Sequence, residues 1–403
     1  MGHNGHDRQG FEIKERERGM HFLKTKTLVF LLLTGMGVLV YSHTGYAQQQ
    51  DHKRLLKAYL SLSDAYDSNV LRSGEQGANK GDNVLYIQPS LAVFLPFRFG
   101  ADFDLNYTFT YVDYSKYSAY NTYFNDLTAS FNVYPVPNLI FGIQDSYTVV
   151  PISPQLPTFA ATNITQANFL NPYIAYKFVI APRFAIDARY DFIYATFPGS
   201  LGIGYYVNEP QVDAAITLSR LVVLKPGFRY ISQTFTASSL GTINQNQPYI
   251  ELDIAHDSKL SFTGSYSYVS FGFKNSSQSG NIYLAKLTYK PNDRLTSDLY
   301  VDGSKSFDIF ARLYTQVEGG LDARYHLTRQ LIGKIEAKYV KIKYAGENYY
   351  TDASGGDIGL SYRFIPWSEV FATYYYYDEK PEASNVIGYS DSRILVGIRA
   401  GIL

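Results

Sequence analysis

The sequence predicts an all-β fold, a transmembrane antiparallel up-and-down β-barrel of about 18 strands, with about 16 as the alternative count. Three kinds of observation predict it: an apolar export segment near the amino terminus, segments that alternate polar and apolar residues without a helical period, and connections that alternate between short and long. Barrels of the bacterial outer membrane have short periplasmic turns and longer extracellular loops. We therefore expect that arrangement in this chain.

The composition suits strands that contact both lipid and water. The 403 residues include 38 Tyr, 26 Phe, one Trp and no Cys. Tyr combines an apolar ring with a polar hydroxyl, so it fits the boundary between lipid and water. The mean hydropathy of −0.17 is too low for a bundle of membrane helices, whereas a barrel needs an apolar residue only at alternate positions. The net charge of zero lacks the basic excess of a nucleic-acid-binding protein, so no nucleic-acid partner is expected.

The amino-terminal segment has the features of a signal peptide. Residues 28–40 are largely apolar but too few to span a bilayer as a helix, which needs about 20 residues. Lys24 and Lys26 precede this run, and small residues near Ala47 fit cleavage between Ala47 and Gln48. We expect residues 1–47 to be an extension and cleavable signal peptide, and residues 48–403 to be the barrel. A buried core helix is the alternative for 28–40, and Met1 and Met20 are both candidate starts.

A period of two runs through the remainder of the chain. In residues 102–111, apolar side chains occupy the odd positions from Phe103 to Tyr111, and polar side chains occupy the even positions from Asp102 to Thr110. The apolar face would contact lipid in a barrel but would pack inward in a soluble sandwich, so the period alone does not choose between them. The alternation of short connections with longer polar stretches favours the barrel.

The connections divide the chain into segments that we expect to be strands. Each segment provides enough residues for a tilted strand to cross the hydrocarbon, which takes about 9–11. The longest expected loop, about 152–165, either folds inward to narrow the lumen or packs over the rim. The expected strands are 55–70, 82–95, 99–114, 122–135, 138–151, 166–180, 183–197, 208–223, 226–237, 247–256, 259–274, 280–290, 294–305, 309–326, 330–344, 350–364, 368–380 and 388–402.

Alternation also predicts which charged side chains line the lumen. We expect an acidic wall, in which Arg189 is the main exception, facing a mixed to basic wall. Opposed walls of this kind would produce a transverse field across the water between them; in the alternative, the charges neutralise one another in local pairs. The acidic wall consists of Asp102, Asp104, Asp126, Asp187, Asp191, Asp213, Glu251 and Asp253. The basic wall consists of Lys286, Lys290, Arg312, Arg324, Lys334, Lys338, Arg363 and Arg393, with Arg399 beside them.

No motif in the sequence points to catalysis or to a cofactor. After residue 47 the only histidines are His52, His256 and His326, and their spacing does not match a metal site. The chain has neither a Gly-x-Ser-x-Gly elbow nor a phosphate-binding loop. We therefore expect no enzyme and no cofactor. Two classes of function remain: a water-filled transport pore, and a non-conducting structural or docking barrel of the outer membrane.

Two stretches near residue 60 and residue 85 resemble a known family. They read Leu-Ser-Asp-Ala-Tyr-Asp-Ser-Asn-Val over 62–70 and Asp-Asn-Val-Leu-Tyr-Ile-Gln-Pro-Ser-Leu over 82–91. They are similar to the opening strands of the β-barrel porin 2 family, although Ser68 replaces an Asp of that pattern. The resemblance implies an integral outer-membrane protein of Gram-negative bacteria, linked to exopolysaccharide export. Outer-membrane lipid, lipopolysaccharide, the barrel assembly machinery and polysaccharide-export components are then the expected partners, and the oligomeric state stays open.

Cleavage after Ala47 is directly testable. We expect mass spectrometry of the protein from the membrane fraction to give a mature chain that begins at Gln48, because the charged, apolar and small-residue segments follow one another in the order that signal peptidase requires. A mature chain that retains residues 28–40 would contradict the signal-peptide interpretation.

Overall fold

The computed structural model describes residues 55–70, 81–97, 100–151, 164–198, 202–237, 241–255, 259–273, 276–382 and 388–401. The predicted signal segment and cleavage site, His52, His256 and most of the expected loop at 152–165 lie outside the described residues.

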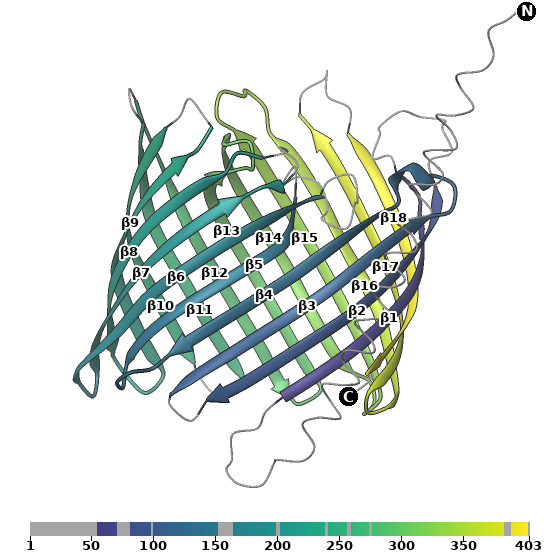
Figure 1. The fold of residues 1–403 in the computed structure, drawn as a ribbon, viewed down its shortest axis with the longest axis horizontal. Helices are drawn as coiled ribbons and strands as arrows, with labels where there is room; N and C mark the ends of the chain where they lie inside the picture. Colours follow the sequence, from purple (N-terminus) through teal and green to yellow (C-terminus); the bar gives the residue numbers. More distant parts are fainter. Residues whose placement is uncertain are drawn as a thin grey trace, which may run out of the picture. The chain divides into compact units, whose positions relative to one another are not determined.

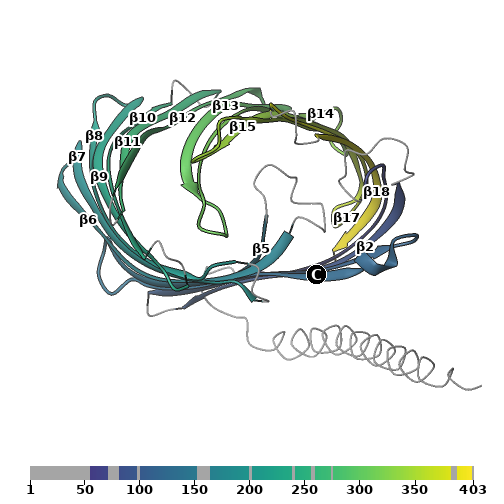
Figure 2. The ribbon, with the colours of Figure 1, turned by 90° about the horizontal axis from the view of Figure 1, so that it is seen from above.

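The described residues form one closed antiparallel sheet of 18 strands (Figures 1 and 2). Each strand pairs with its neighbours in the sequence, and β1 also pairs with β18, which closes the ring. This confirms the predicted fold class and the count of 18. The alternative count of 16 required the two weak segments near 226–256 not to be strands, but they form β9 and β10. The strands are β1 Leu55–Asp67, β2 Asp82–Phe97, β3 Ala101–Tyr114, β4 Thr122–Val133, β5 Leu139–Pro151, β6 Ile164–Ala181, β7 Phe184–Thr196, β8 Tyr205–Thr217, β9 Val222–Phe235, β10 Thr242–Ala255, β11 Leu260–Gly272, β12 Ser277–Asn292, β13 Leu295–Phe307, β14 Leu313–His326, β15 Leu331–Tyr344, β16 Thr351–Ile365, β17 Ser368–Pro381 and β18 Tyr389–Gly401.

Helical structure is confined to one short turn, η1 at Ser118–Tyr120, among the described residues. No helix in this part of the chain is long and apolar enough to cross a membrane. The connections at one end of the ring, such as 182–183 and 366–367, are short, and we call this the turn end. Those at the other end, such as 197–204 and 345–350, are longer, and we call this the loop end.

Alternate side chains face the two sides of the sheet. In β11, Ser265 and Ser267 line a cavity inside the ring, whereas Tyr266 and Tyr268 lie on the outer face with about half of their surface exposed. The outer face carries many large apolar side chains in the same state, among them Leu299 at 55% and Ile358 at 60% exposure. Contiguous exposed apolar surface of this extent is unfavourable in water and marks a lipid-facing belt.

The four consecutive tyrosines of β17, residues 374–377, also alternate between the two faces of the sheet. Tyr374 and Tyr376 lie on the outer face, exposed by 45% and 46%, while Tyr377 is buried on the inner side and Tyr375 lines an inner cavity. The run therefore places two rings on each face, as the alternation predicts. Trp367, in the turn between β16 and β17, is 59% exposed.

A buried ion pair lies where the first and last strands meet. Arg393 of β18 and Asp67 of β1 are 2.6 Å apart, and their side chains are 5% and 0% exposed. The Arg393 guanidinium also donates to the Tyr86 hydroxyl of β2 at 2.8 Å. Arg393 faces the inner side of the ring and is among the residues that line a cavity there, but most of its side chain is buried among β1, β2 and β18, because Asp67 and Tyr86 enclose it.

The two family-like stretches provide further contacts near this seam. The Ser68 hydroxyl donates to Asp391 at 3.1 Å, and the Ser392 backbone N–H donates to Ser68 at 2.8 Å. The carboxylate of Asp82 accepts hydrogen bonds from the backbone N–H groups of Lys116 and Tyr117, at 2.9 and 2.8 Å, which orders the β3–β4 connection. The residues of these stretches thus have structural roles in closing the barrel and fixing its loop end.

The two faces of β3 give a direct test of the outward and inward assignments. We expect Leu105→Arg, on the outer face, to destabilise the barrel by about 2–4 kcal/mol in lipid, because a cation near the bilayer midplane is poorly solvated. Thr108 lines an inner cavity, so Thr108→Arg should be tolerated. Urea unfolding of both variants in lipid vesicles measures the difference. Equal destabilisation by the two substitutions would indicate a packed soluble core.

The seam gives a second test. Asp67→Asn leaves Arg393 buried without its counter-charge, so we expect a loss of about 3–5 kcal/mol in the free energy of unfolding. The matched control is Asp64→Asn, because Asp64 lies exposed on the same strand. A stability of the Asp67 variant equal to that of the control would show that the ion pair does not hold the seam.

Candidate functional site

The candidate site is the inner face of the ring. Strand alternation places on this face all of the acidic residues that the sequence assigns to one wall. The structure also adds four charged side chains that the sequence interpretation did not include: Lys177, Glu209, Lys225 and Arg229. Each has the inward parity of its strand, so the period of two carried the signal that would have identified them. Their ion pairs change the charge balance of that wall.

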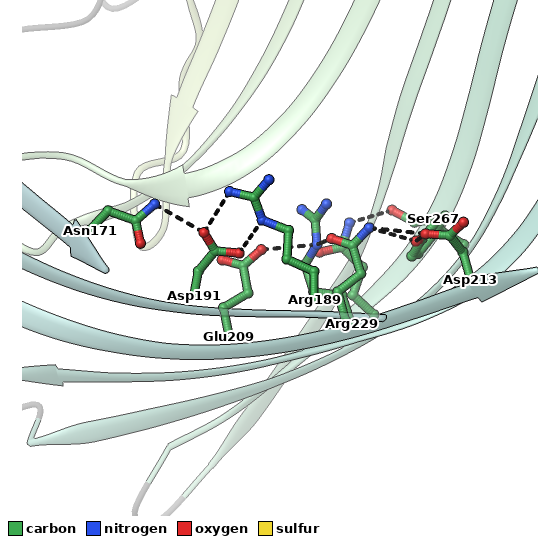
Figure 3. Close-up of polar contacts among 10 residues, drawn as sticks. Asn171, Arg189, Asp191, Glu209, Asp213, Arg229 and Ser267 are labelled. Carbon is green, nitrogen blue, oxygen red and sulfur yellow. Dashed lines mark hydrogen bonds and ion pairs between the residues drawn. The ribbon is translucent and has the colours of Figure 1, made fainter. Parts of the chain in front are cut away.

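The first group of pairs lies on β6 to β9 (Figure 3). Arg189 pairs with Asp191 at 2.6 Å, and the Asn171 amide donates to the same carboxylate at 3.0 Å. Arg229 pairs with Glu209 at 3.1 Å, as the dashed contacts in Figure 3 show. Two cations and two carboxylates therefore neutralise one another in this part of the wall.

The second group lies on β9 and β10. The ammonium of Lys225 contacts Glu251 at 2.5 Å and Asp253 at 2.8 Å. Nearby, Lys177 pairs with Asp187 at 3.5 Å. Local ion pairs therefore hold four of the eight predicted acidic residues, because lysines and arginines on the same or adjacent strands meet these carboxylates in register.

The remaining predicted acidic residues have no ion pair among the described residues. Asp102 accepts hydrogen bonds from Asn132 and Tyr134, at 2.9 and 2.8 Å, and Asp104 accepts one from Asn106 at 2.6 Å. Tyr249 donates to Asp213 at 3.1 Å. Asp126 lies on the inner face of β4 by strand parity. Dipolar side chains solvate most of this group.

The predicted basic wall also keeps part of its charge without an ion pair. Lys286 pairs with Asp298 at 3.0 Å, and Lys334 pairs with Glu336 at 2.7 Å and Asp357 at 3.5 Å. Arg399 pairs with Glu369 at 3.0 Å. Four predicted members of this wall have no ion pair within the part of the chain that the structure describes: Lys290, Arg324, Lys338 and Arg363.

The position of Arg312 differs from the prediction that it belongs to the basic wall. It lies in the turn before β14, at the tip of the β13–β14 hairpin, and not in the wall. Asp308 holds its guanidinium at 2.6 Å, and the guanidinium lies 4.5 Å from the centre of the Tyr344 ring. The reason is that the pairing of β13 with its wall neighbour β12 ends well before the tip.

The β13 arm of this hairpin leaves its wall neighbour β12 and turns into the lumen, while β14 stays paired with β15 up to Tyr314 and Tyr344. Pairing of β13 with β12 ends at Gly303, whereas β13 and β14 stay paired up to Phe307 and Leu313. Figure 2 shows the hairpin, in green, reaching inside the ring. Its Phe307 ring lies 5.5 Å from Phe235 and 5.9 Å from Phe271, which belong to the inner faces of β9 and β11. The tip therefore covers part of the lumen near the loop end.

Backbone contacts fix the tip in this position. The Ile203 N–H donates to the carbonyl of Ile309 at 2.7 Å, and the Lys305 ammonium donates to the carbonyl of Ser279 at 2.8 Å. A side chain at Gly280 would clash with Lys305, because a Cβ there would lie 2.9 Å from its Cδ atom. The glycine thus lets the hairpin pack against the wall.

The stem of the β5–β6 hairpin also leaves the wall. The pairing of β4 with β5 ends at Tyr147, and that of β6 with β7 ends at Asn168, yet β5 and β6 stay paired up to Pro151 and Ile164. The end of β5 appears inside the ring in Figure 2. Two hairpins therefore narrow the lumen from its loop end.

Cavities inside the ring remain between these elements and the wall. Two of them, of about 620 and 690 Å³, share Arg363, Glu369 and Arg399 and form one groove along β14–β18, β1 and β2 toward the turn end. A third cavity, of about 420 Å³, lies on the opposite part of the inner face, beside Lys225 and Arg229 of β9. No group of His, Cys, Asp and Glu that could hold a metal ion is found among the described residues.

Comparisons with known proteins found similar solved structures but no matching family model and no matching curated sequence. Among solved structures, the chain is similar to Pseudomonas aeruginosa OpdK with vanillate, at 10% identity and a TM-score of 0.47, covering 86% of this chain and 98% of that one. Similar values hold for P. aeruginosa OccK2 in complex with glucuronate (9%, 0.49, 86% and 98%) and for Acinetobacter baumannii OccAB4 (9%, 0.47, 88% and 99%). At these identities the likeness concerns the fold alone.

The Lys225 cluster predicts an effect on ion selectivity. Lys225→Met leaves Glu251 and Asp253 without their cation, so we expect the reversal potential in a KCl gradient to shift toward cation preference. The shift should shrink in 1 M salt, where the Debye length is about 3 Å. Lys225→Arg keeps the charge and serves as the control. An unchanged reversal potential in the Met variant would mean that permeating ions do not pass this wall.

Proposed function

We propose that the protein is an integral outer-membrane pore through which small hydrophilic solutes diffuse. The observation that carries this proposal is a charged and polar inner face, with cavities of about 420 to 690 Å³, inside a ring whose outer face is apolar. A barrel of 18 strands is wide enough for an aqueous channel unless its own segments fill it.

The exposed apolar belt supports the membrane location. Side chains such as Leu299, Ile358 and Val396 are more than half exposed on the outer face and would be desolvated only by lipid. Outer-membrane lipid, lipopolysaccharide and the barrel assembly machinery are the partners that this location implies. Export components, and an exported polysaccharide as cargo, are a finer proposal that rests on the resemblance of residues 62–70 and 82–91 alone.

The competing function is a closed structural barrel. The β13–β14 tip and the β5–β6 stem occupy part of the lumen and favour it. Against it, the Arg363 guanidinium lies on the wall of a cavity and forms no ion pair among the described residues, so water or a solute is needed to solvate it. Apolar packing of the whole lumen would be the simpler way to close a barrel, and the described inner wall lacks it along this groove.

Electrical recording decides between the two functions. The purified, heat-modifiable barrel inserted into planar bilayers should give a steady, ohmic single-channel conductance in KCl. A barrel that inserts but stays closed at all voltages and salt concentrations would contradict the pore, while leaving the fold unaffected.

A further inference from the structure

Resting on the proposed pore function, we propose that the groove along β14–β18, β1 and β2 is a binding site for the carboxylate group of small organic acids, with Arg324 and Arg363 as its ligands. Both side chains line the stretch of this groove with a volume of about 620 Å³, and both face the lumen. The site is distinct from the wall formed by β6 to β10, where Arg189 and Arg229 each pair with a carboxylate.

Charge pairing along the groove isolates these two guanidinium groups. Lys334 is satisfied by Glu336, Arg393 by Asp67 and Arg399 by Glu369. Among the described residues, Glu369 is the one carboxylate that lines the groove, and it faces Arg363 across the β16–β17 pair. Its ion pair is nevertheless with Arg399, so Arg363 has no carboxylate within ion-pair distance among the described residues.

Arg324 is isolated for a different reason. Its partners across the neighbouring strands are Lys334 and Thr296, a cation and a neutral hydroxyl. The carboxylates that approach this region, Asp322 and Asp357, are both directed to Lys334, at 3.8 and 3.5 Å. Of the described residues, none forms an ion pair with Arg324.

Among the described residues that line the groove, five are cations and one is a carboxylate. Such a wall concentrates anions, because low-dielectric surroundings focus the field into the cavity. A guanidinium presents a planar fork of N–H donors that matches a carboxylate in two parallel hydrogen bonds. Beside the two arginines lie the hydroxyls of Ser361 and Thr373 and the ring of Tyr375, which suit the hydroxylated body of an organic acid.

The test uses the full mature barrel in planar bilayers, with potassium gluconate as the probe and glucose as its uncharged counterpart. We expect gluconate to produce resolvable blocks of the KCl current and glucose at the same concentration to produce none. In Arg324→Gln/Arg363→Gln, the apparent Kd for block should rise by at least about tenfold, which corresponds to about 1.4 kcal/mol.

The matched control is Lys290→Gln/Lys338→Gln, which removes two unpaired lumen cations outside the groove. Both double variants should shift the reversal potential toward cations, because both remove two positive charges, but only the arginine variant should lose the block. An open channel that gluconate does not block, or a block lost equally in both variants, would overturn the binding site and leave the pore standing. A barrel with no conductance would overturn the proposed function itself, and the site with it.

Discussion

Closure of the sheet is the constraint on which the rest of the structure depends. In hydrocarbon every backbone N–H and C=O group needs a partner within the protein, and a sheet provides this only when its edges meet. Here β1 pairs with β18 over residues 59–67 and 393–401. The buried pair of Arg393 and Asp67, linked to Tyr86, crosses that junction. Because a buried charge is costly without its partner, this ion pair favours the one register in which both groups are satisfied.

Once the ring is closed, strand parity assigns each side chain to lipid or lumen. Side chains follow that assignment through β3, β11 and β17. At the tip of β13, however, a side chain with the parity of the lipid-facing side lies inside the ring. Leu299 and Val301 lie on the lipid-facing side, whereas Phe307, of the same parity, packs against Phe235 and Phe271 inside the ring. The face that would contact lipid in the wall becomes apolar packing within the lumen, so the hairpin can fold inward with its Phe307 ring packed against other rings.

The sequence predicted the strand number and the inner face, because both follow from the local period of two and from connection length. It did not predict how the charges pair. Lys225 meets Glu251 and Asp253 only through the register of β9 with β10, which is a property of the folded sheet. The burial of Arg393 depends on contact between segments more than 300 residues apart. The inward turn of Arg312 with its hairpin depends on packing against β9–β11, for which the local pattern has no signature.

The central claim is that a lipid-facing belt surrounds a lumen that contains water. The chain has no cysteine, so single cysteines carrying a nitroxide label can be introduced without background labelling. Labels at Leu299, Val301 and Ile358 should collide mainly with lipid-soluble oxygen, and labels at Ser265, Ser361 and Thr373 mainly with a water-soluble nickel complex. Electron paramagnetic resonance of the protein in lipid vesicles measures both. Inner positions sheltered from the nickel complex, or outer positions that contact it as readily as inner ones, would contradict the account.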